Sequence, residues 1–204
     1  MVDQTEVEIK FILDDAPAMR QKIVELGGRS RGQHAEINVR LDDTSRSLST
    51  GGSLLRLRYI ESDFEKHTLV TVKTPTAGED TIFRARREIE FTVSEPDSMA
   101  AAFEVLGYMP IWRYEKRRET FELAGAEIAL DETPLGTFME IEGEEASIQA
   151  AANLIGMDVA AGSLKSYSEL FACVKERLSL PMDDLTFEAF AGFTVNPDDI
   201  RACL

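Results

Sequence analysis

The stretch Thr5-Glu6-Val7-Glu8-Ile9-Lys10-Phe11 alternates charged with apolar residues without a break. Neighbouring side chains of a β-strand point to opposite faces, so this alternation predicts a strand. Glu6, Glu8 and Lys10 would share one face of that strand, and the three apolar residues between and after them would share the other. The face that carries two carboxylates and an amine is the starting point for the rest of the chain.

The same pattern returns at Arg86-Arg87-Glu88-Ile89-Glu90-Phe91 and at Phe138-Met139-Glu140-Ile141-Glu142. In each of the three stretches, two carboxylates stand two residues apart on one face and repel each other across about 7 Å. A solvated strand face is often charged, which is the ordinary explanation for any one of these strands. That explanation predicts charges of both signs, however, and not a doublet of one sign in strand after strand.

The whole chain has 204 residues and a formal net charge of −15. This length predicts one large domain, or a domain with an appendage, and the ordinary hydrophobic content predicts a globular protein. No apolar run reaches the roughly 20 residues of a membrane span and no signal peptide is recognisable, so we expect a cytoplasmic protein with no membrane contact. Cys173 and Cys203 lack metal-ligand spacing and are expected to be reduced thiols.

The basic residues are grouped although the protein is acidic. They lie at Arg56/Arg58, at Arg84/Arg86/Arg87 and at Arg113/Lys116/Arg117/Arg118. The net negative charge argues against a nucleic-acid partner, which needs a basic face. Focused basic doublets on an acidic protein instead indicate a small anionic ligand.

Further alternating stretches predict an α+β protein with one antiparallel sheet and flanking helices. If the sheet curls into a barrel, the charged faces line its interior. The acidic residues would then be Glu6, Glu8, Glu88, Glu90, Asp131, Glu140 and Glu142, and the basic ones Lys10, Arg56, Arg58, Lys73, Arg84, Arg86, Lys116 and Arg118. Buried like charges cost several kcal/mol each unless they are compensated, so the carboxylates call for a cation and the arginines for a multivalent anion.

The chemistry of these groups indicates phosphoryl transfer. Carboxylate oxygens favour Mg²⁺ or Mn²⁺ over zinc, and arginine forks suit phosphate oxygens. A metal that bridges carboxylates to a polyphosphate held by Arg and Lys is a common arrangement in phosphoryl-transfer enzymes. The sequence has no Gly-rich phosphate loop, which excludes a P-loop enzyme.

The motifs resemble those of the CYTH superfamily, the triphosphate tunnel metalloenzymes. Glu6-Val7-Glu8-Ile9-Lys10 resembles the family's Glu-x-Glu-x-Lys signature, and the other motifs follow in family order. They are Leu55-Arg56-Leu57-Arg58, Val72-Lys73, Arg86 with Glu88 and Glu90, Glu115-Lys116-Arg117-Arg118, Leu130-Asp131, Phe138-Met139-Glu140-Ile141-Glu142 and Lys165-Ser166-Tyr167. The chain departs from the family at Asn38–Asp42, where an aromatic often precedes the aspartate, and this leaves the outer end of the site undefined.

The resemblance covers roughly residues 5 to 175 and implies a closed antiparallel tunnel of eight strands with flanking helices. We therefore expect a CYTH triphosphate-tunnel domain at residues 1–180. Residues 181–204 would be a C-terminal helical extension that packs on the domain or lies at a homodimer contact. Phe187, Phe190 and Phe193 stand at helical spacing within this tail.

The resemblance also implies the roles of the site residues. Glu6, Glu8, Glu140 and Glu142 would hold Mg²⁺ or Mn²⁺, with Glu88, Glu90 and Asp131 linked to the metals. Lys10, Arg56, Arg58, Lys73, Arg86, Lys116 and Arg118 would bind phosphate, and Glu6, Glu8, Lys10 and Lys116 would be catalytic. Tyr167 would either touch the substrate or pack beside it.

Three functions fit these expectations. A class IV adenylate cyclase would use the ribose hydroxyl to attack the α-phosphorus of ATP and expel pyrophosphate. A triphosphatase would use a metal-ordered water to hydrolyse tripolyphosphate, thiamine triphosphate or a nucleoside triphosphate. A non-catalytic module would only bind polyphosphate or a nucleotide, although a complete acidic set would then be needless.

Overall fold

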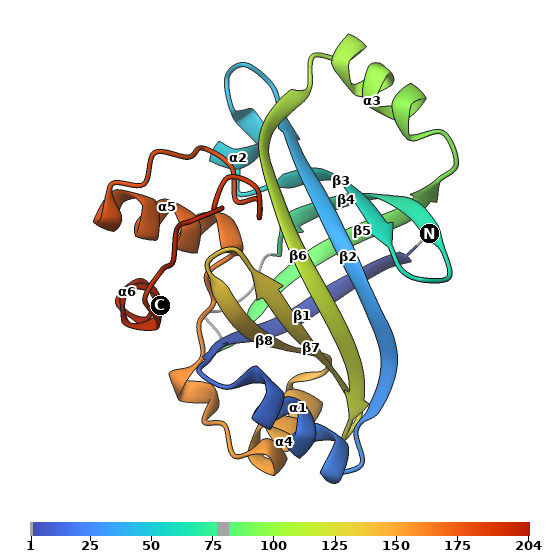
Figure 1. The fold of residues 1–204 in the computed structure, drawn as a ribbon. Coiled ribbons are helices and arrows are strands. Elements are labelled where there is room, and N and C mark those ends of the chain that lie inside the picture. Colours follow the sequence, from blue (N-terminus) through green and yellow to red (C-terminus); the bar gives the residue numbers. More distant parts are fainter. Residues whose placement is uncertain (1, 77–81) are drawn as a thin grey trace.

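Eight antiparallel strands close into a barrel in the computed structural model, which describes residues 2–76 and 82–204 (Figure 1). The strand order around the barrel is β1-β5-β4-β3-β2-β6-β7-β8. The strands are β1 (Val2–Leu13), β2 (Arg29–Asp42), β3 (Leu54–Glu61), β4 (Lys66–Pro75), β5 (Arg84–Val93), β6 (Met109–Leu123), β7 (Ala126–Thr133) and β8 (Gly136–Glu142). The predicted α+β fold with an eight-stranded closed tunnel is confirmed.

The helices lie outside the barrel or at its ends (Figure 1). They are α1 (Ala16–Glu25), α2 (Ser47–Thr50), α3 (Pro96–Val105), α4 (Glu145–Ile155), the short 3₁₀ helix η1 (Val159–Ala161), α5 (Tyr167–Leu178) and α6 (Pro197–Arg201). None of the helices in the described part of the chain is long and apolar enough to span a membrane.

Strand β1 closes the barrel because it pairs with β5 along its first half and with β8 along its second. Glu8 lies at the changeover, where its neighbours are Arg84 on β5 and Glu142 on β8. The alternation of β1 therefore has a direct spatial meaning. Glu6, Glu8 and Lys10 point into the barrel, and Ile9 and Phe11 point out toward the helices.

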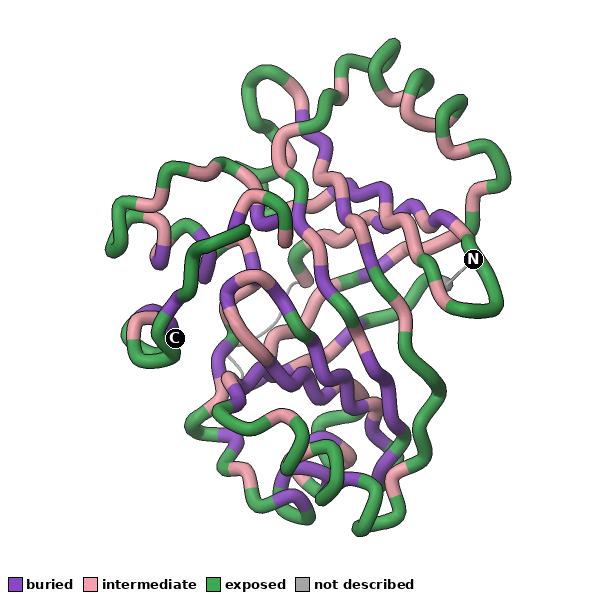
Figure 2. Tube along the Cα trace, in the orientation of Figure 1, coloured by how far each residue is buried: buried purple, intermediate pink, exposed green. Residues whose placement is uncertain are grey.

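Helices cover part of the outer face of the barrel, so both faces of several strands are buried there (Figure 1). Ile9 and Phe11 of β1 pack in one cluster with Ile148 and Ile155 of α4. Burying large apolar side chains under a helix stabilises the fold by about 1.5–3 kcal/mol each. Figure 2 shows most buried positions on the strands, whereas α3 is largely exposed. This outer core fixes which strand face must point inward.

Helix α5 packs across one side of the barrel, and the C-terminal tail packs against α5 (Figure 1). Ser166 caps the helix in a capping box with Glu169, which fixes where α5 begins. In the tail, Leu185 bridges Tyr114 on the edge of β6, and its backbone N–H donates to the carbonyl of Arg113 at 3.0 Å. The tail thus continues the barrel wall beside α5.

The aromatic residues of the tail do not form a helical stripe. Residues 187–192 are turns, and the one helix of the tail is the five-residue α6. Phe190 is buried in the cluster beneath α5, whereas Phe193 is 48% exposed. The boundary at residue 180 and the dimer contact stay predictions.

The expectation of two reduced thiols is wrong. Cys173 on α5 and Cys203 after α6 form a disulfide with their Cα atoms 5.9 Å apart. The two cysteines meet because α6 folds back onto α5, a long-range contact that a separation of 30 residues in sequence does not reveal. Because disulfides persist in oxidising surroundings, this disulfide does not support the expected cytoplasmic location, which stays a prediction.

Candidate active site in the barrel

The barrel encloses a cavity of about 250 Å³ into which charged side chains from most of the strands point. Thirteen of the fourteen residues predicted for the site line it. They are Glu6, Glu8, Lys10, Arg56, Arg58, Lys73, Arg86, Glu88, Glu90, Lys116, Arg118, Glu140 and Glu142. The fourteenth, Asp131, does not line the cavity and is fully buried.

Nine of the lining side chains are basic and seven are acidic, although the chain as a whole carries a charge of −15. The fold has therefore collected into one cavity a large part of the positive charge of an acidic protein. The lining has more basic than acidic side chains, and this charge balance favours a small anion as a ligand.

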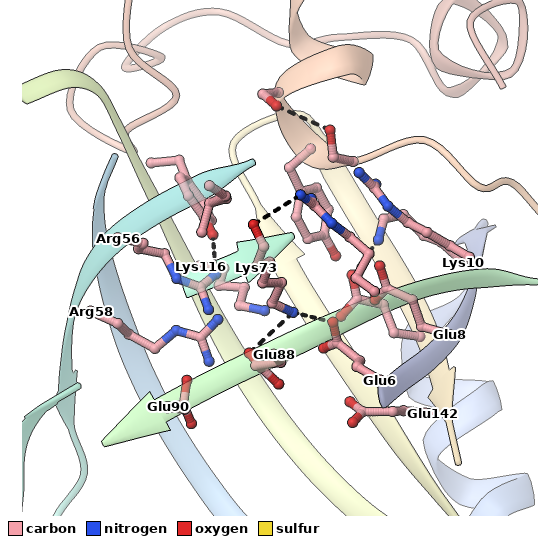
Figure 3. Close-up of a pocket in the computed structure, with 18 of the residues that line it drawn as sticks. Glu6, Glu8, Lys10, Arg56, Arg58, Lys73, Glu88, Glu90, Lys116 and Glu142 are labelled. Carbon is pink, nitrogen blue, oxygen red and sulfur yellow. Dashed lines mark hydrogen bonds and ion pairs between the residues drawn. The ribbon is translucent and has the colours of Figure 1, made fainter. Parts of the chain in front are cut away.

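The carboxylates Glu6, Glu8, Glu88, Glu90 and Glu142 gather on one side of the cavity (Figure 3). Lys73 forms ion pairs with Glu6 and, at 3.3 Å, with Glu88. Burial opposes ionisation of Glu6, but Lys73 outweighs it and lowers the pKa of that carboxyl. Glu142 has no such partner, so burial and then Glu6 raise its pKa to about 8. This side of the cavity holds more negative charge than its own cations neutralise.

Lys10 is almost completely buried and bonds to Glu140, which also pairs with Arg118. The Lys10 amine lies 4.3 Å from the centre of the Tyr167 ring, so a cation–π contact adds to the ion pair. Burial alone would lower the pKa of Lys10, yet Glu140 reverses this and raises it. Lys10 is therefore a fixed positive charge in the wall of the cavity.

Two buried carboxylates, Asp131 and Glu36, do not line the cavity themselves but hold the cations that do. Asp131 accepts hydrogen bonds from Lys116 at 3.1 Å, from both ends of the Arg118 fork at 2.6 Å and from the Tyr167 hydroxyl at 2.8 Å. Glu36 lies 3.3 Å from Arg58 Nε and 3.7 Å from Lys116 Nζ. Lys116 is thus held between two carboxylates.

Glu36 was missed in the sequence although a signal was present. It stands on β2 in the same register as Asn38, whose side-chain amide donates to it at 3.2 Å. Burial opposes its ionisation, but Arg58 and then Lys116 hold its pKa well below the usual range. Strand alternation places residues 36 and 38 on the inward face of β2. Glu36 has no second carboxylate two residues away, however, so the doublet pattern did not identify it.

Arg56 and Tyr114 form a second buried contact. Arg56 is 4% exposed, donates to the Tyr114 hydroxyl at 2.7 Å and to Thr71 at 3.1 Å, and keeps an Nε without a hydrogen-bond partner among the described residues. Thr71 in turn donates to Glu90 at 2.7 Å. Tyr114 shares the face of Lys116 and Arg118 on β6, so alternation could have placed it in the site.

At the end of the cavity beside α5, Arg40, Ser166 and Ser168 also line the wall. Arg40 donates to Ser168 at 2.8 Å, and Arg86 donates to backbone carbonyls of Gly52 and Lys73. Arg40 and the two serines were not predicted for the site. Arg40 falls in the segment where the chain departs from the expected motif, and the serines belong to α5, whose position the strand pattern does not encode.

No three of the described His, Cys, Asp or Glu side chains converge into a ready-made metal site. Among the described His, Cys, Asp and Glu residues, those that line the cavity are all glutamates. Burial and then Glu6 raise the pKa of Glu142, and a divalent cation beside these carboxylates would offset both effects. In chemistry, though not in a preformed geometry, this set fits a hard cation such as Mg²⁺ or Mn²⁺.

Comparison with known proteins agrees with the geometry. A Methanocaldococcus jannaschii protein provisionally named an adenylate cyclase is 28% identical over 138 residues, which cover 67% of this chain and 75% of that protein. A Vibrio parahaemolyticus structure described as a provisional adenylate cyclase superposes with a TM-score of 0.71 at 23% identity, over 84% of this chain and 99% of the other.

A Hippeastrum structure is described as a provisional adenylyl cyclase with a dominant triphosphatase activity. It superposes with a TM-score of 0.58 at 18% identity, over 82% of this chain and 95% of the other. The model of the CYTH domain family matches residues 4–157, which include the strands of the barrel, except the first two residues of β1, and the whole charged cavity apart from its α5 edge. The chain belongs to the CYTH domain family.

Proposed function

We propose that this protein is a metal-dependent enzyme that acts on a triphosphate inside the barrel, and that it converts ATP to cyclic AMP and pyrophosphate. The observation that carries the proposal is the meeting of a carboxylate group and a set of arginines and lysines in one enclosed cavity of about 250 Å³. A polyphosphate with its divalent cation is complementary to both halves of that cavity.

The carboxylates that strands β1 and β8 direct into the cavity would hold the cation. Glu8 on β1 is in register with Glu142 on β8, and Glu6 lies two residues before Glu8 on the same face of β1 (Figure 3). When bound, the cation would neutralise phosphate charge and lower the pKa of the attacking hydroxyl. Glu88 and Glu90 face the same part of the cavity and could complete or orient this set.

Asp131 has a different role in this proposal from the one first expected. Its oxygens are occupied by Lys116, Arg118 and Tyr167, and it does not line the cavity. We therefore assign Asp131 to the positioning of Lys116 and Arg118 and not to the metal. Those two cations, with Lys10 and Arg58, would bind and orient the phosphate groups.

The protein's own residues can restrict the reaction to an enclosed, preorganised site. Lys10, Arg118 and Glu140 form one network, and Lys116, Arg118 and Asp131 form another, so the cations keep their places without substrate. Fixed charges in a site with little water stabilise the charge that develops in a transition state more than mobile charges do.

Hydrolysis is the second candidate. The specific support is the described triphosphatase activity of the Hippeastrum structure, which has the same fold, together with the complete Glu140/Glu142 pair. In this case a metal-ordered water, and not the ribose hydroxyl, would attack the terminal phosphorus.

Product analysis separates the candidates. The purified protein would be incubated with Mg²⁺ or Mn²⁺ and, in turn, with ATP, tripolyphosphate and thiamine triphosphate. Cyclic AMP with pyrophosphate supports the cyclase, and orthophosphate supports the triphosphatase. Tight binding without turnover of any of the three would overturn the proposal of an enzyme and leave the binding module.

A further inference from the structure

The basic residues of the cavity fall into two groups. Lys10, Arg58, Lys73, Lys116 and Arg118 each have a carboxylate oxygen within 4 Å, and Arg84 lies 3.5 Å from Glu169. Arg40, Arg56 and Arg86 have no carboxylate within that distance in residues 2–76 and 82–204. We refer to these three residues as the unpaired arginine cluster.

The members of the cluster act on one another. Arg40 on β2 is in register with Arg56 on β3. Burial lowers the pKa of Arg40; Tyr114 and Asp42 oppose this shift, and Arg56 adds to it by a smaller amount. Burial and then Arg84 lower the pKa of Arg86; Glu6 opposes this shift, and Arg40 adds to it by a smaller amount. Arg40 thus repels both Arg56 and Arg86, and an anion bound beside these guanidinium groups would offset that repulsion.

Neutral groups accept the hydrogen bonds of the unpaired arginine cluster, whose residues line the cavity. Arg40 donates to Ser168, Arg56 to Tyr114 and Thr71, and Arg86 to backbone carbonyls, so within the described residues these hydrogen bonds go to neutral groups. Asp42 and Glu6 attract Arg40 and Arg86 only from beyond ion-pair distance. The Nε of buried Arg56 lacks a hydrogen-bond partner among the described residues. A buried guanidinium N–H without a partner costs free energy until a ligand satisfies it.

The first turn of α5 adds to the same end of the cavity. Ser168 is the second residue of this 12-residue helix, and Ser166 is its N-cap; both line the cavity, and their hydroxyls lie 3.0 Å apart. The positive end of a helix dipole therefore lies beside the arginines.

We infer that Arg40, with Arg56, Arg86 and the first turn of α5, forms an outer phosphate subsite that determines how long a polyphosphate chain the cavity binds. This inference rests on the proposed triphosphate substrate and deepens it. The paired cations would hold the phosphates nearest the carboxylates, and the unpaired arginine cluster would hold the phosphate group beyond them. Arg40 is the member that neither the motifs nor the family resemblance points to.

The test measures metal-free binding of tripolyphosphate and of pyrophosphate by calorimetry. Arg40→Gln removes the charge and keeps a polar side chain. We expect it to weaken tripolyphosphate binding about tenfold and pyrophosphate binding less than threefold. Arg87→Gln is the matched control, because Arg87 is the next residue along β5 from Arg86, points outward and pairs with Asp3. It should leave both affinities unchanged.

Unchanged tripolyphosphate binding in Arg40→Gln would overturn the subsite, and so would an equal loss for the two ligands, which would mean a general effect of charge. If Arg40→Gln does not fold, Arg40→Lys and Ser168→Ala test the same contact, and both should weaken tripolyphosphate more than pyrophosphate. Because this binding assay contains no metal, a protein without turnover can still pass it, and an active enzyme can fail it.

Discussion

The paired cations and the unpaired arginine cluster lie in one cavity but differ in how the fold treats them. Lys116 is held between Glu36 and Asp131, whereas the hydrogen-bond partners of Arg40 among the described residues are hydroxyl groups. The paired cations are balanced before any ligand arrives. The unpaired arginines are balanced only when an anion binds. The difference teaches that one part of the cavity is built for the stability of its own geometry and the other for the ligand.

The largest expected effect is on turnover. Glu8→Gln keeps the size of the side chain but removes a carboxylate at the junction of β5, β1 and β8. If this carboxylate binds the catalytic cation, metal-dependent turnover should fall by about 10³-fold or more. Initial rates with Mg²⁺ and ATP or tripolyphosphate would measure the loss. Glu132→Gln, at an exposed pair with Arg117, should retain full activity. An active Glu8→Gln enzyme would refute the metal assignment.

The next effect is on stability and concerns the paired cations. Asp131→Asn leaves Lys116 and Arg118 with much less compensation at a site that is completely buried. Breaking a buried pair from one side costs about 3–5 kcal/mol, so the free energy of unfolding in urea should fall by that amount. A loss below about 1 kcal/mol would show that the cations do not depend on Asp131, and the comparison between the two groups would fail.

The pH dependence of Glu142 gives a third test. The pKa of this carboxyl rises from 4.5 to about 8 in the folded protein, so its contribution to stability is present below pH 4.5 and is lost as the pH rises to about 8. Without metal, the free energy of unfolding of Glu142→Gln should therefore rise relative to that of the wild type between pH 4.5 and 8, by at most a few kcal/mol. Melting temperatures at pH 4.5 and 8.5 would check this, and added Mg²⁺ should narrow the gap at pH 8.5. A constant difference across this range would contradict the assigned charge imbalance.

The smallest expected effect is on the stability of Arg40→Gln, and its sign is opposite to that expected for Asp131→Asn. Arg40→Gln removes an unpaired, partly buried cation near another arginine, so the ligand-free protein should gain up to about 1 kcal/mol of unfolding free energy. Urea unfolding with and without tripolyphosphate measures both halves of this prediction, because the ligand should stabilise the wild type more than the variant. A clear loss of stability in the ligand-free variant would mean that Arg40 is structural.

Sequence reasoning reached most of the site because strand alternation is local. Once β1, β5 and β8 are strands, Glu8, Glu88 and Glu142 must share faces with their neighbours two residues away. The same rule extends to Glu36 and Tyr114, which line up with inward residues of β2 and β6. They were missed because neither stands in a doublet of like charge.

The remaining features depend on contacts between distant segments. Asp131 shares the inward face of β7, but whether it meets a metal or Lys116 and Arg118 depends on the register of β6 against β7. Ser168 reaches Arg40 across 128 positions of sequence, and Cys173 meets Cys203 only after the tail folds back.

The sequence by itself determined the strands, their inward faces and the collection of opposite charges on those faces, because the two-residue period of a strand is a property of the local backbone. Only the tertiary structure decided which cations are paired and which are not. Pairing depends on atoms within a few ångströms that come from strands and helices far apart in the chain, and the closure of the barrel and the docking of α5 set those distances.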